Sequence, residues 1–157
     1  MFGFAHRVNT PVAILVSVFS FLVVVPSPAA AQAPGIRGGV SMNPDQVYVG
    51  GHYETGPLVD RLHFKPNAEL GFGDDITLFS INFEFVYKIM TRRDWTLYAG
   101  GGPAINFYSF DDSDDGDTEP GFNGLFGAET SRGLFFEVKV GAIDSPELKF
   151  CVGWSFK

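Results

Sequence analysis

Residues 76–89 carry the pattern that decides the fold, and they read ITLFSINFEFVYKI. From residue 79 onward, large apolar side chains alternate with smaller or polar ones. The apolar set is Phe79, Ile81, Phe83, Phe85, Tyr87 and Ile89, and the alternating set is Ser80, Asn82, Glu84, Val86 and Lys88. Successive side chains of a β-strand point to opposite faces. The stretch therefore predicts a strand with one apolar face and one mostly polar face.

The same alternation recurs along residues 36–156, between short turns rich in Gly, Pro, Asp and Asn. The predicted strands are eight in number, at 36–42, 46–54, 61–72, 76–89, 95–110, 122–129, 133–143 and 147–156. No segment keeps a helical period over more than two turns. The sequence therefore predicts an all-β chain that forms an eight-stranded antiparallel up-and-down β-barrel.

Charged residues fall on only one face of these strands, and we predict that they form a structural network inside the barrel. The predicted lumen network consists of Arg37, His52, Glu54, His63, Lys65, Glu69, Glu84, Lys88, Glu137, Lys139 and Lys149. Arg61 and Glu129 lie on the same predicted face, which then holds six basic and five acidic residues. Buried charges are tolerated only when they are paired, so this near balance favours a closed lumen.

Alternation by itself leaves two barrels open. A membrane barrel turns its apolar face to lipid and its polar face to the lumen. A soluble, periplasmic barrel of lipocalin type inverts the faces, so that Glu84 and Lys139 would face water. In that alternative a pocket for a small apolar ligand would be lined by Phe79, Phe83, Phe136 and Phe150.

Most of the remaining acidic residues gather in alternate turns, which an up-and-down barrel places at one end. That end would hold eleven acids and no base, namely Asp45, Asp74, Asp75, Asp111, Asp112, Asp114, Asp115, Asp117, Glu119, Asp144 and Glu147. The opposite turns hold Asp60, Arg92, Arg93, Asp94 and Arg132. The whole chain of 157 residues has a net charge of −7, so its composition suggests no nucleic-acid partner.

Residues 1–31 read as a secretory signal peptide. His6 and Arg7 precede an uncharged apolar run, and Ala29-Ala30-Ala31 fits a cleavage site. The run of about 14 apolar residues is shorter than the roughly 20 that a membrane-spanning helix needs, which disfavours the alternative of an uncleaved anchor. We expect cleavage after Ala31, which leaves residues 32–157 as the barrel domain. The single Cys151 rules out an internal disulfide framework and a cysteine-clustered zinc site.

These features resemble the small eight-stranded outer-membrane β-barrels of Gram-negative bacteria, the type of the OmpA barrel and OmpX. The resemblance rests on the signal peptide, the amphipathic strands and the closing strand LKFCVGWSF at 148–156, after which Lys157 follows. It implies an exported outer-membrane protein with a structural or surface role. The implied partners are outer-membrane lipids, lipopolysaccharide and the barrel-assembly machinery. A monomer with no cofactor and no catalytic activity is expected, and a lumen this narrow is filled by side chains rather than open as a pore.

The acidic segment from Asp111 to Glu119 invites a calcium hypothesis. Asp111, Ser113, Asp115 and Gly116 match the first half of an EF-hand loop, but the position of the bidentate carboxylate would be Phe122. We therefore assign no metal site and predict a solvated, mobile loop. Diffuse binding of divalent cations is the weaker alternative.

Two histidines raise the alternative of a lipid-modifying enzyme. His52 and His63 lie on the polar faces of neighbouring strands, and Ser80 in the next strand is the nearest candidate nucleophile. The competing interpretation, which we adopt, places both histidines in the lumen network.

Several local features bear on the strand ends. Trp95, Trp154, Tyr87 and Phe156 lie near strand ends, as an interfacial aromatic girdle requires. Arg92-Arg93 is a candidate contact for anionic lipid head groups, although a solvated turn is the simpler interpretation.

Two prolines count against a regular barrel. Pro66 and Pro103 fall inside predicted strands, where each removes a ladder hydrogen bond. Gly100-Gly101-Gly102-Pro103 is a candidate bulge or bend.

Overall fold

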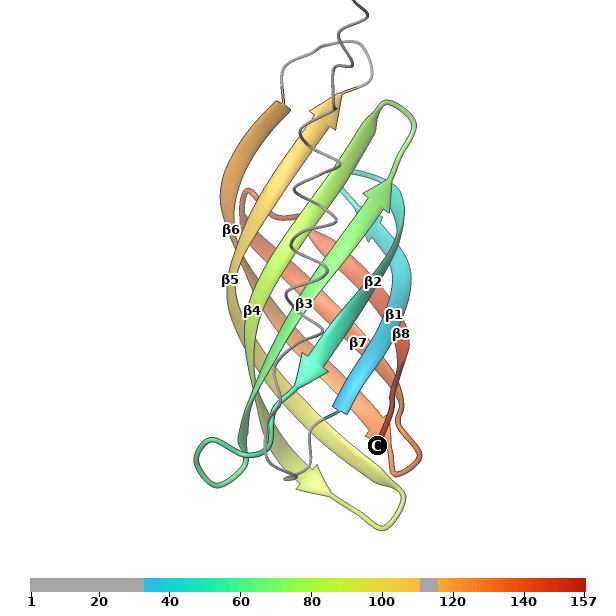
Figure 1. The fold of residues 1–157 in the computed structure, drawn as a ribbon, viewed down its shortest axis with the longest axis vertical. Helices are drawn as coiled ribbons and strands as arrows, with labels where there is room; N and C mark the ends of the chain where they lie inside the picture. The colour runs from blue at the N-terminus through green and yellow to red at the C-terminus, as the bar shows by residue number, and fades with distance from the viewer. Residues whose placement is uncertain (1–32, 111–115) are drawn as a thin grey trace, which may run out of the picture.

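The computed structural model describes residues 33–110 and 116–157, which form a closed barrel of eight antiparallel strands (Figure 1). The strands are β1 (Ala33–Met42), β2 (Gln46–Glu54), β3 (Leu62–Phe72), β4 (Ile76–Thr91), β5 (Trp95–Phe110), β6 (Gly116–Thr130), β7 (Leu134–Ile143) and β8 (Leu148–Ser155). Each strand pairs with its sequence neighbours, and β1 pairs with β8. The predicted fold class is confirmed. The predicted signal peptide lies outside the described residues.

The strand boundaries differ from the prediction mainly at β6, which we expected to begin at residue 122. The β5–β6 ladder continues outward through Ala104↔Gly121 to Ser109↔Gly116, so the prediction that 117–119 belong to a loop was wrong. Backbone hydrogen bonds build this extension, and they do not need apolar side chains. Because Gly121 pairs with Ile143 at the end of β7, residues before Gly121 project beyond that strand. The predicted loop residues 111–115 lie outside the described part of the chain.

The two faces of the sheet differ in kind. Positions of one parity are buried and mostly polar, and those of the other parity are apolar and exposed. In β4, for example, Asn82, Glu84 and Val86 are buried, whereas Phe83, Phe85 and Tyr87 are exposed. The buried face lines the inside of the barrel, which we call the lumen. The apolar side chains therefore form the outer face of the molecule.

Pro103 is accommodated by a local gap in the β4–β5 ladder. Pairing passes from Asn82↔Ala104 to Phe85↔Gly101 in an unchanged register, and skips Phe83 and Glu84. In this register Pro103 stands opposite Phe83 and has no N–H to donate to it. Of the candidate bulge or bend at 100–103, the bulge is absent, since the register shift in this ladder falls at Ile89, between Lys88 and Met90. Glycines at 100–102 serve close strand approach instead, because a Cβ at Gly102 would overlap the Phe83 carbonyl oxygen.

Pro66 sits where a ladder ends. Ala68 and Phe64 direct their backbone oxygens toward β2, since the first lies against Gly50 and the second accepts from Thr55 N–H at 2.9 Å. Pro66 has the same parity, so its missing donor would also face β2. The last pair of the regular β2–β3 ladder is His52↔Asn67, so Pro66, the neighbour of Asn67 in β3, lies just outside this ladder. The proline therefore removes no bond from the regular part of that ladder.

The two ends of the barrel are defined by the connections. The ends of the described chain, at Ala33 and Lys157, lie with the β2–β3, β4–β5 and β6–β7 connections, at the bottom of Figure 1. We call this the terminal end. The other connections form the acidic end, with Asp45, Asp74, Asp75, Asp117, Glu119, Asp144 and Glu147. In the described residues, no helix is long and apolar enough to cross a membrane.

We predict that Gly102→Ala destabilises the barrel by about 1–3 kcal/mol, because its Cβ must displace the backbone of β4. Gly124→Ala is the matched control, since the nearest atom to its Cβ would be the Val140 oxygen at 3.9 Å. Urea unfolding of the two variants measures the difference. Equal stabilities would show that the close approach of β4 and β5 is not a real constraint.

Candidate functional site

The centre of the lumen holds a cluster of ion pairs around Lys139. Its Nζ lies 2.7 Å from Glu84, 3.0 Å from Glu69 and 3.7 Å from Glu137, and none of its surface is exposed. Arg37 donates through Nη1 to Glu69 at 3.2 Å and to Glu137 at 3.3 Å. These residues come from β1, β3, β4 and β7, so the pairs cross the barrel and join strands that are not neighbours.

Two further lysines complete this cluster from opposite sides. Lys149 on β8 donates to Glu69 at 2.8 Å, and Lys65 on β3 donates to Glu137 at 3.2 Å. Tyr98 on β5 donates its hydroxyl to the same Glu137 oxygen at 2.9 Å. Each carboxylate of the cluster thus has more than one cationic or hydrogen-bonding partner. Such multiple pairing is what makes a buried charge tolerable.

A chain of three carboxamides spans the lumen beside the ion pairs. Asn123 donates to Asn82 and Asn82 donates to Asn67, both at 2.8 Å, and Asn67 donates to Glu84 at 2.7 Å. The chain passes from β6 to β4 across β5, where the inward residues are Gly102 and Ala104. The small residues of β5 therefore make room for a direct contact between β4 and β6.

The acidic end of the lumen is covered by the β7–β8 connection. Asn106 donates to the backbone oxygen of Asp144 at 2.7 Å and accepts from Ser80 at 2.8 Å. Tyr108 also donates to the Asp144 oxygen, at 2.9 Å. Ser145 is buried against Gly121, where a Cβ would overlap its hydroxyl. This connection is therefore fixed over the lumen opening.

A second, smaller charge group occupies the terminal end of the lumen. Lys88 lies 2.7 Å from Glu54 and 3.6 Å from Glu129, and His63 Nδ1 lies 3.4 Å from Glu54. Lys157 reaches Glu129 at 3.0 Å from the exposed side. Lys157, which follows Phe156, therefore forms an ion pair with a lumen carboxylate.

Aromatic rings that were not predicted as lumen residues fill the space between the charges. Phe135 is fully buried, with Lys65 Nζ 4.4 Å and the Arg37 guanidinium 5.5 Å from its ring centroid. Tyr48 and Tyr98 are buried as well, and each has a lysine over its ring. Their position in the alternation could have identified them. Phe135, for example, is two residues before Glu137 and four before Lys139, so it lies on the same face of the strand.

The structure places all of the predicted network residues on the lumen face, and it moves one residue that the prediction put beside them. Arg61 lies exposed just before β3, because that strand begins at Leu62 rather than at 61. Without Arg61, the lumen face holds five basic and five acidic residues, so the formal charges cancel. The basic residues are Arg37, Lys65, Lys88, Lys139 and Lys149, and the acidic residues are Glu54, Glu69, Glu84, Glu129 and Glu137.

The two histidines do not meet Ser80. His52 Nε2 lies 3.0 Å from the Ser155 hydroxyl, a pair created by the closure of β1 on β8, and Ser80 bonds to Asn106 instead. His52 Nδ1 is buried without a partner in the described structure, so the pair lacks an orienting carboxylate. Ser155 has no exposed surface. This geometry does not favour nucleophilic catalysis.

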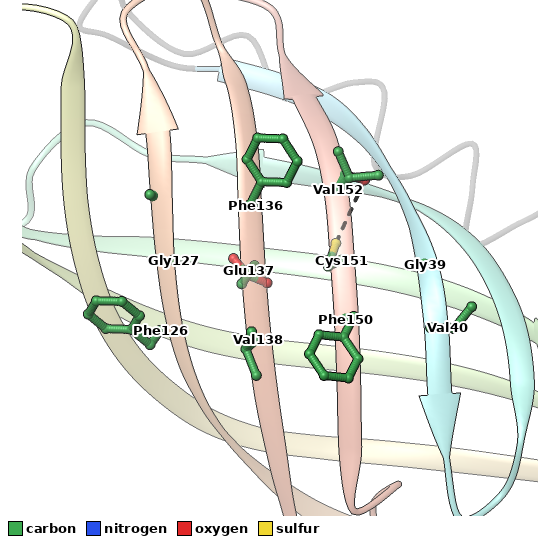
Figure 2. Close-up of a pocket in the computed structure, with 11 residues that line it drawn as sticks. Gly39, Val40, Phe126, Gly127, Phe136, Glu137, Val138, Phe150, Cys151 and Val152 are labelled. Atoms are coloured by element: carbon green, nitrogen blue, oxygen red, sulfur yellow. Dashed lines mark hydrogen bonds between the residues drawn. The ribbon is translucent and has the colours of Figure 1, made fainter.

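The outer face carries a shallow groove of about 450 Å³ (Figure 2). It crosses β6, β7, β8 and β1, and its outward side chains are Val40, Phe126, Ala128, Phe136, Val138, Phe150 and Val152. Phe83, Phe136 and Phe150, which the lipocalin-type alternative placed around an internal pocket, are all exposed on this face. The inverted arrangement of faces is therefore not the one that the structure adopts.

Metal binding has no described candidate. Residues 33–110 and 116–157 contain no group of three or more His, Cys, Asp or Glu that could hold a metal ion. Phe122, which stands where an EF-hand loop has its bidentate carboxylate, is an exposed apolar residue of β6. The carboxylates at 111–115 lie outside the described residues.

Comparison with solved structures supports the fold. The barrel is similar to the crystal structure of the N-terminal β-barrel domain of OprF from Pseudomonas aeruginosa, with a TM-score of 0.60, 15% identity and coverage of 80% of this chain and 96% of that chain. A solution NMR structure of the de novo designed TMB2.3 is also similar, with a TM-score of 0.48, 17% identity and coverage of 85% and 98%. No protein-family model and no curated protein matches the chain. The predicted resemblance to small eight-stranded outer-membrane β-barrels is confirmed at the level of fold.

We predict that Lys139→Met lowers the free energy of unfolding by about 3–5 kcal/mol, because a buried carboxylate loses its partner. Glu84 would keep only Arg37, at 4.0 Å, as an ionic partner. Adding Glu84→Gln should restore part of the loss, which a double-mutant cycle measures. The exposed control Asp75→Asn should change stability by no more than about 0.5 kcal/mol. A Lys139 variant as stable as this control would contradict a stabilising role for the central ion pairs.

Proposed function

We propose that this protein is an integral outer-membrane β-barrel with a structural or surface role, and that it does not act as an open pore. The observation that carries the proposal is the separation of the two faces. The outer face is apolar on every strand, whereas the strand charges lie on the lumen face, apart from Asp117 and Glu119 on the projecting start of β6. This is the arrangement that a bilayer requires and that water penalises.

The extent of the exposed apolar surface supports this environment. Each strand contributes to it, as shown by Ile36, Val47, Phe72, Phe83, Ile105, Phe126, Val138 and Val152, one from each of the eight strands. Soluble monomers rarely expose contiguous apolar patches of more than a few hundred Å². The apolar surface here runs around the whole barrel, so its area is larger than that of such a local patch. In a bilayer, lipid chains would cover these apolar side chains and keep them out of water.

The filled lumen supports a structural role. Lys139, Glu84 and Asn82 have no exposed surface, and the β7–β8 connection covers the acidic end. A solute would have to break buried ion pairs to pass. The same closed ladder leaves no strand edge for pairing with another chain, which supports a monomer.

The orientation follows from the two ends. In outer-membrane barrels the chain extends further beyond the membrane on the outside than on the periplasmic side. The β2–β3 connection, residues 55–61, lies at the terminal end, but the paired ends of β5 and β6 project beyond β7 at the acidic end. We therefore place the terminal end in the periplasm and the acidic end at the cell surface. There it would face lipopolysaccharide, after insertion by the barrel-assembly machinery. The pKa of Glu119, on the projecting part of β6, is raised by partial desolvation and by Asp144 and Asp117, as expected in a crowded acidic rim.

A single substitution separates the membrane environment from an aqueous one. Val138 lies at the middle of β7 on the outer face, and Val47 lies at the acidic end of β2. In a bilayer, Val138→Arg should destabilise by about 2–4 kcal/mol and Val47→Arg by roughly 0–1 kcal/mol. Unfolding in lipid vesicles measures both. Equal and negligible effects would contradict a lipid-facing belt.

Cell fractionation and gel migration test the proposal directly. The protein should sediment with the outer membrane, require detergent for release, and migrate differently before and after heating in a detergent gel. Recovery from the soluble periplasm without detergent would overturn the proposal.

A further inference from the structure

We propose that the terminal end of the barrel carries a docking surface for anionic phospholipid head groups. The surface consists of Arg61, Arg92, Arg93 and Arg132, which we call the arginine rim, together with the exposed rings of Tyr87, Trp95 and Trp154. This inference rests on the proposed membrane location, and it adds the lipid chemistry that one leaflet presents to the protein.

The first observation is the charge difference between the two ends. Arg61, Arg92, Arg93 and Arg132 are all exposed at the terminal end, where the described residues include two exposed acids, Asp60 and Asp94. The acidic end has seven acids and no base within the described residues. The net charge is therefore positive at one end and negative at the other.

The second observation is that the rim arginines are available. Within the described residues, Arg92, Arg93 and Arg132 form no ion pair, and Arg61 only donates to the Ile89 oxygen at 3.4 Å. Lys157, by contrast, is paired with Glu129. The lumen charges cancel among themselves, so they do not occupy the rim. The guanidinium groups are free to bind an external anion.

The third observation places an exposed aromatic ring beside each connection that bears an arginine. Arg61 precedes Leu62, which pairs with Tyr87, and Arg92 N–H donates to the Trp95 oxygen at 2.7 Å. Arg132 lies in the turn before Leu134, which pairs with Trp154. The three residues are 40–45% exposed. Tyrosine and tryptophan prefer the boundary between hydrocarbon and head groups. Arginines just beyond them would meet the phosphates.

The spacing of the arginines favours a lipid surface over one soluble anion. They come from three separate connections, β2–β3, β4–β5 and β6–β7. A site for a single phosphate would need converging donors, whereas a leaflet offers many phosphates around the barrel. Guanidinium groups bind phosphate oxygens in a bidentate manner. Anionic lipid is therefore the chemistry that this rim fits.

The test compares vesicles of phosphatidylcholine with vesicles of equal parts phosphatidylcholine and phosphatidylglycerol. Residues 32–157, the chain expected after signal-peptide cleavage, are folded into both kinds of vesicle. Unfolding of the inserted protein in urea is then measured at low salt. We expect phosphatidylglycerol to stabilise the folded barrel, by up to roughly five-fold in the folding equilibrium per rim arginine. The gain should shrink as salt is added.

Three variants make the test specific. In Arg61→Gln/Arg92→Gln/Arg93→Gln/Arg132→Gln the phosphatidylglycerol gain should disappear. In the matching set of Arg→Lys replacements most of it should remain, because the charge is kept. In the acidic-end control Asp45→Asn/Asp74→Asn/Asp75→Asn/Glu147→Gln it should persist. A gain that is unchanged in the Gln variant, or lost equally in the acidic-end control, would overturn the docking surface.

Two further outcomes separate the possible failures. If the wild-type chain does not insert into either vesicle, the proposed function fails. If it inserts into both with equal stability, the proposed function stands and the docking surface is wrong. Inorganic phosphate, compared with chloride at equal ionic strength in phosphatidylcholine vesicles, should not reproduce the gain. If phosphate reproduces it, the rim binds the free anion and the lipid assignment is overturned.

Discussion

The structure depends on the pairing of charges inside a closed sheet. Ten ionisable residues of opposite sign share a lumen in which nine of them are buried, and their formal charges cancel. An unpaired ion in such a space would cost several kcal/mol, which is a large part of the stability of a domain. Lys139 on β7 pairs with Glu69 on β3 and Glu84 on β4, which lie across the barrel, and Arg37 on β1 pairs with Glu137 on β7, beyond β8. They therefore favour one closed arrangement, with one particular register, over the many that alternation alone would allow.

The same alternation links the inside of the barrel to its surroundings. Because neighbouring residues point to opposite faces, a shift of one residue in any strand would expose a charge such as Glu84 and bury Phe83 or Phe85. The strand register therefore determines the residues of the lumen and those of the outer apolar belt together. Glycines allow the strands to approach closely enough to satisfy it, as at Gly102, where the carbonyl of Phe83 occupies the space of a side chain.

Beyond the belt, the two ends of the molecule differ in charge and in their aromatic residues. Acids gather around the connection that covers the lumen, whereas arginines and exposed Trp and Tyr rings gather at the terminal end. A barrel that is neutral inside and apolar outside can present its charges only at these ends. They are consequently the surfaces that can distinguish one side of a membrane from the other, and they give the molecule a preferred orientation.

The sequence by itself determined the all-β class, the number of strands and, except for Arg61, the face on which each predicted lumen charge lies, because parity along a strand is a local property. The tertiary structure decided which charges meet. The contact of Lys139 with Glu69, the reach of Asn123 to Asn82, and the pairing of His52 with Ser155 join residues 41 to 103 positions apart. Such contacts depend on strand tilt and stagger, and on the bulge at Ile89, which no local pattern reveals. The exterior position of Arg61 and the early start of β6 escaped prediction for a related reason. Strand ends are set by backbone pairing with a neighbour, and side-chain patterning does not report where that pairing stops.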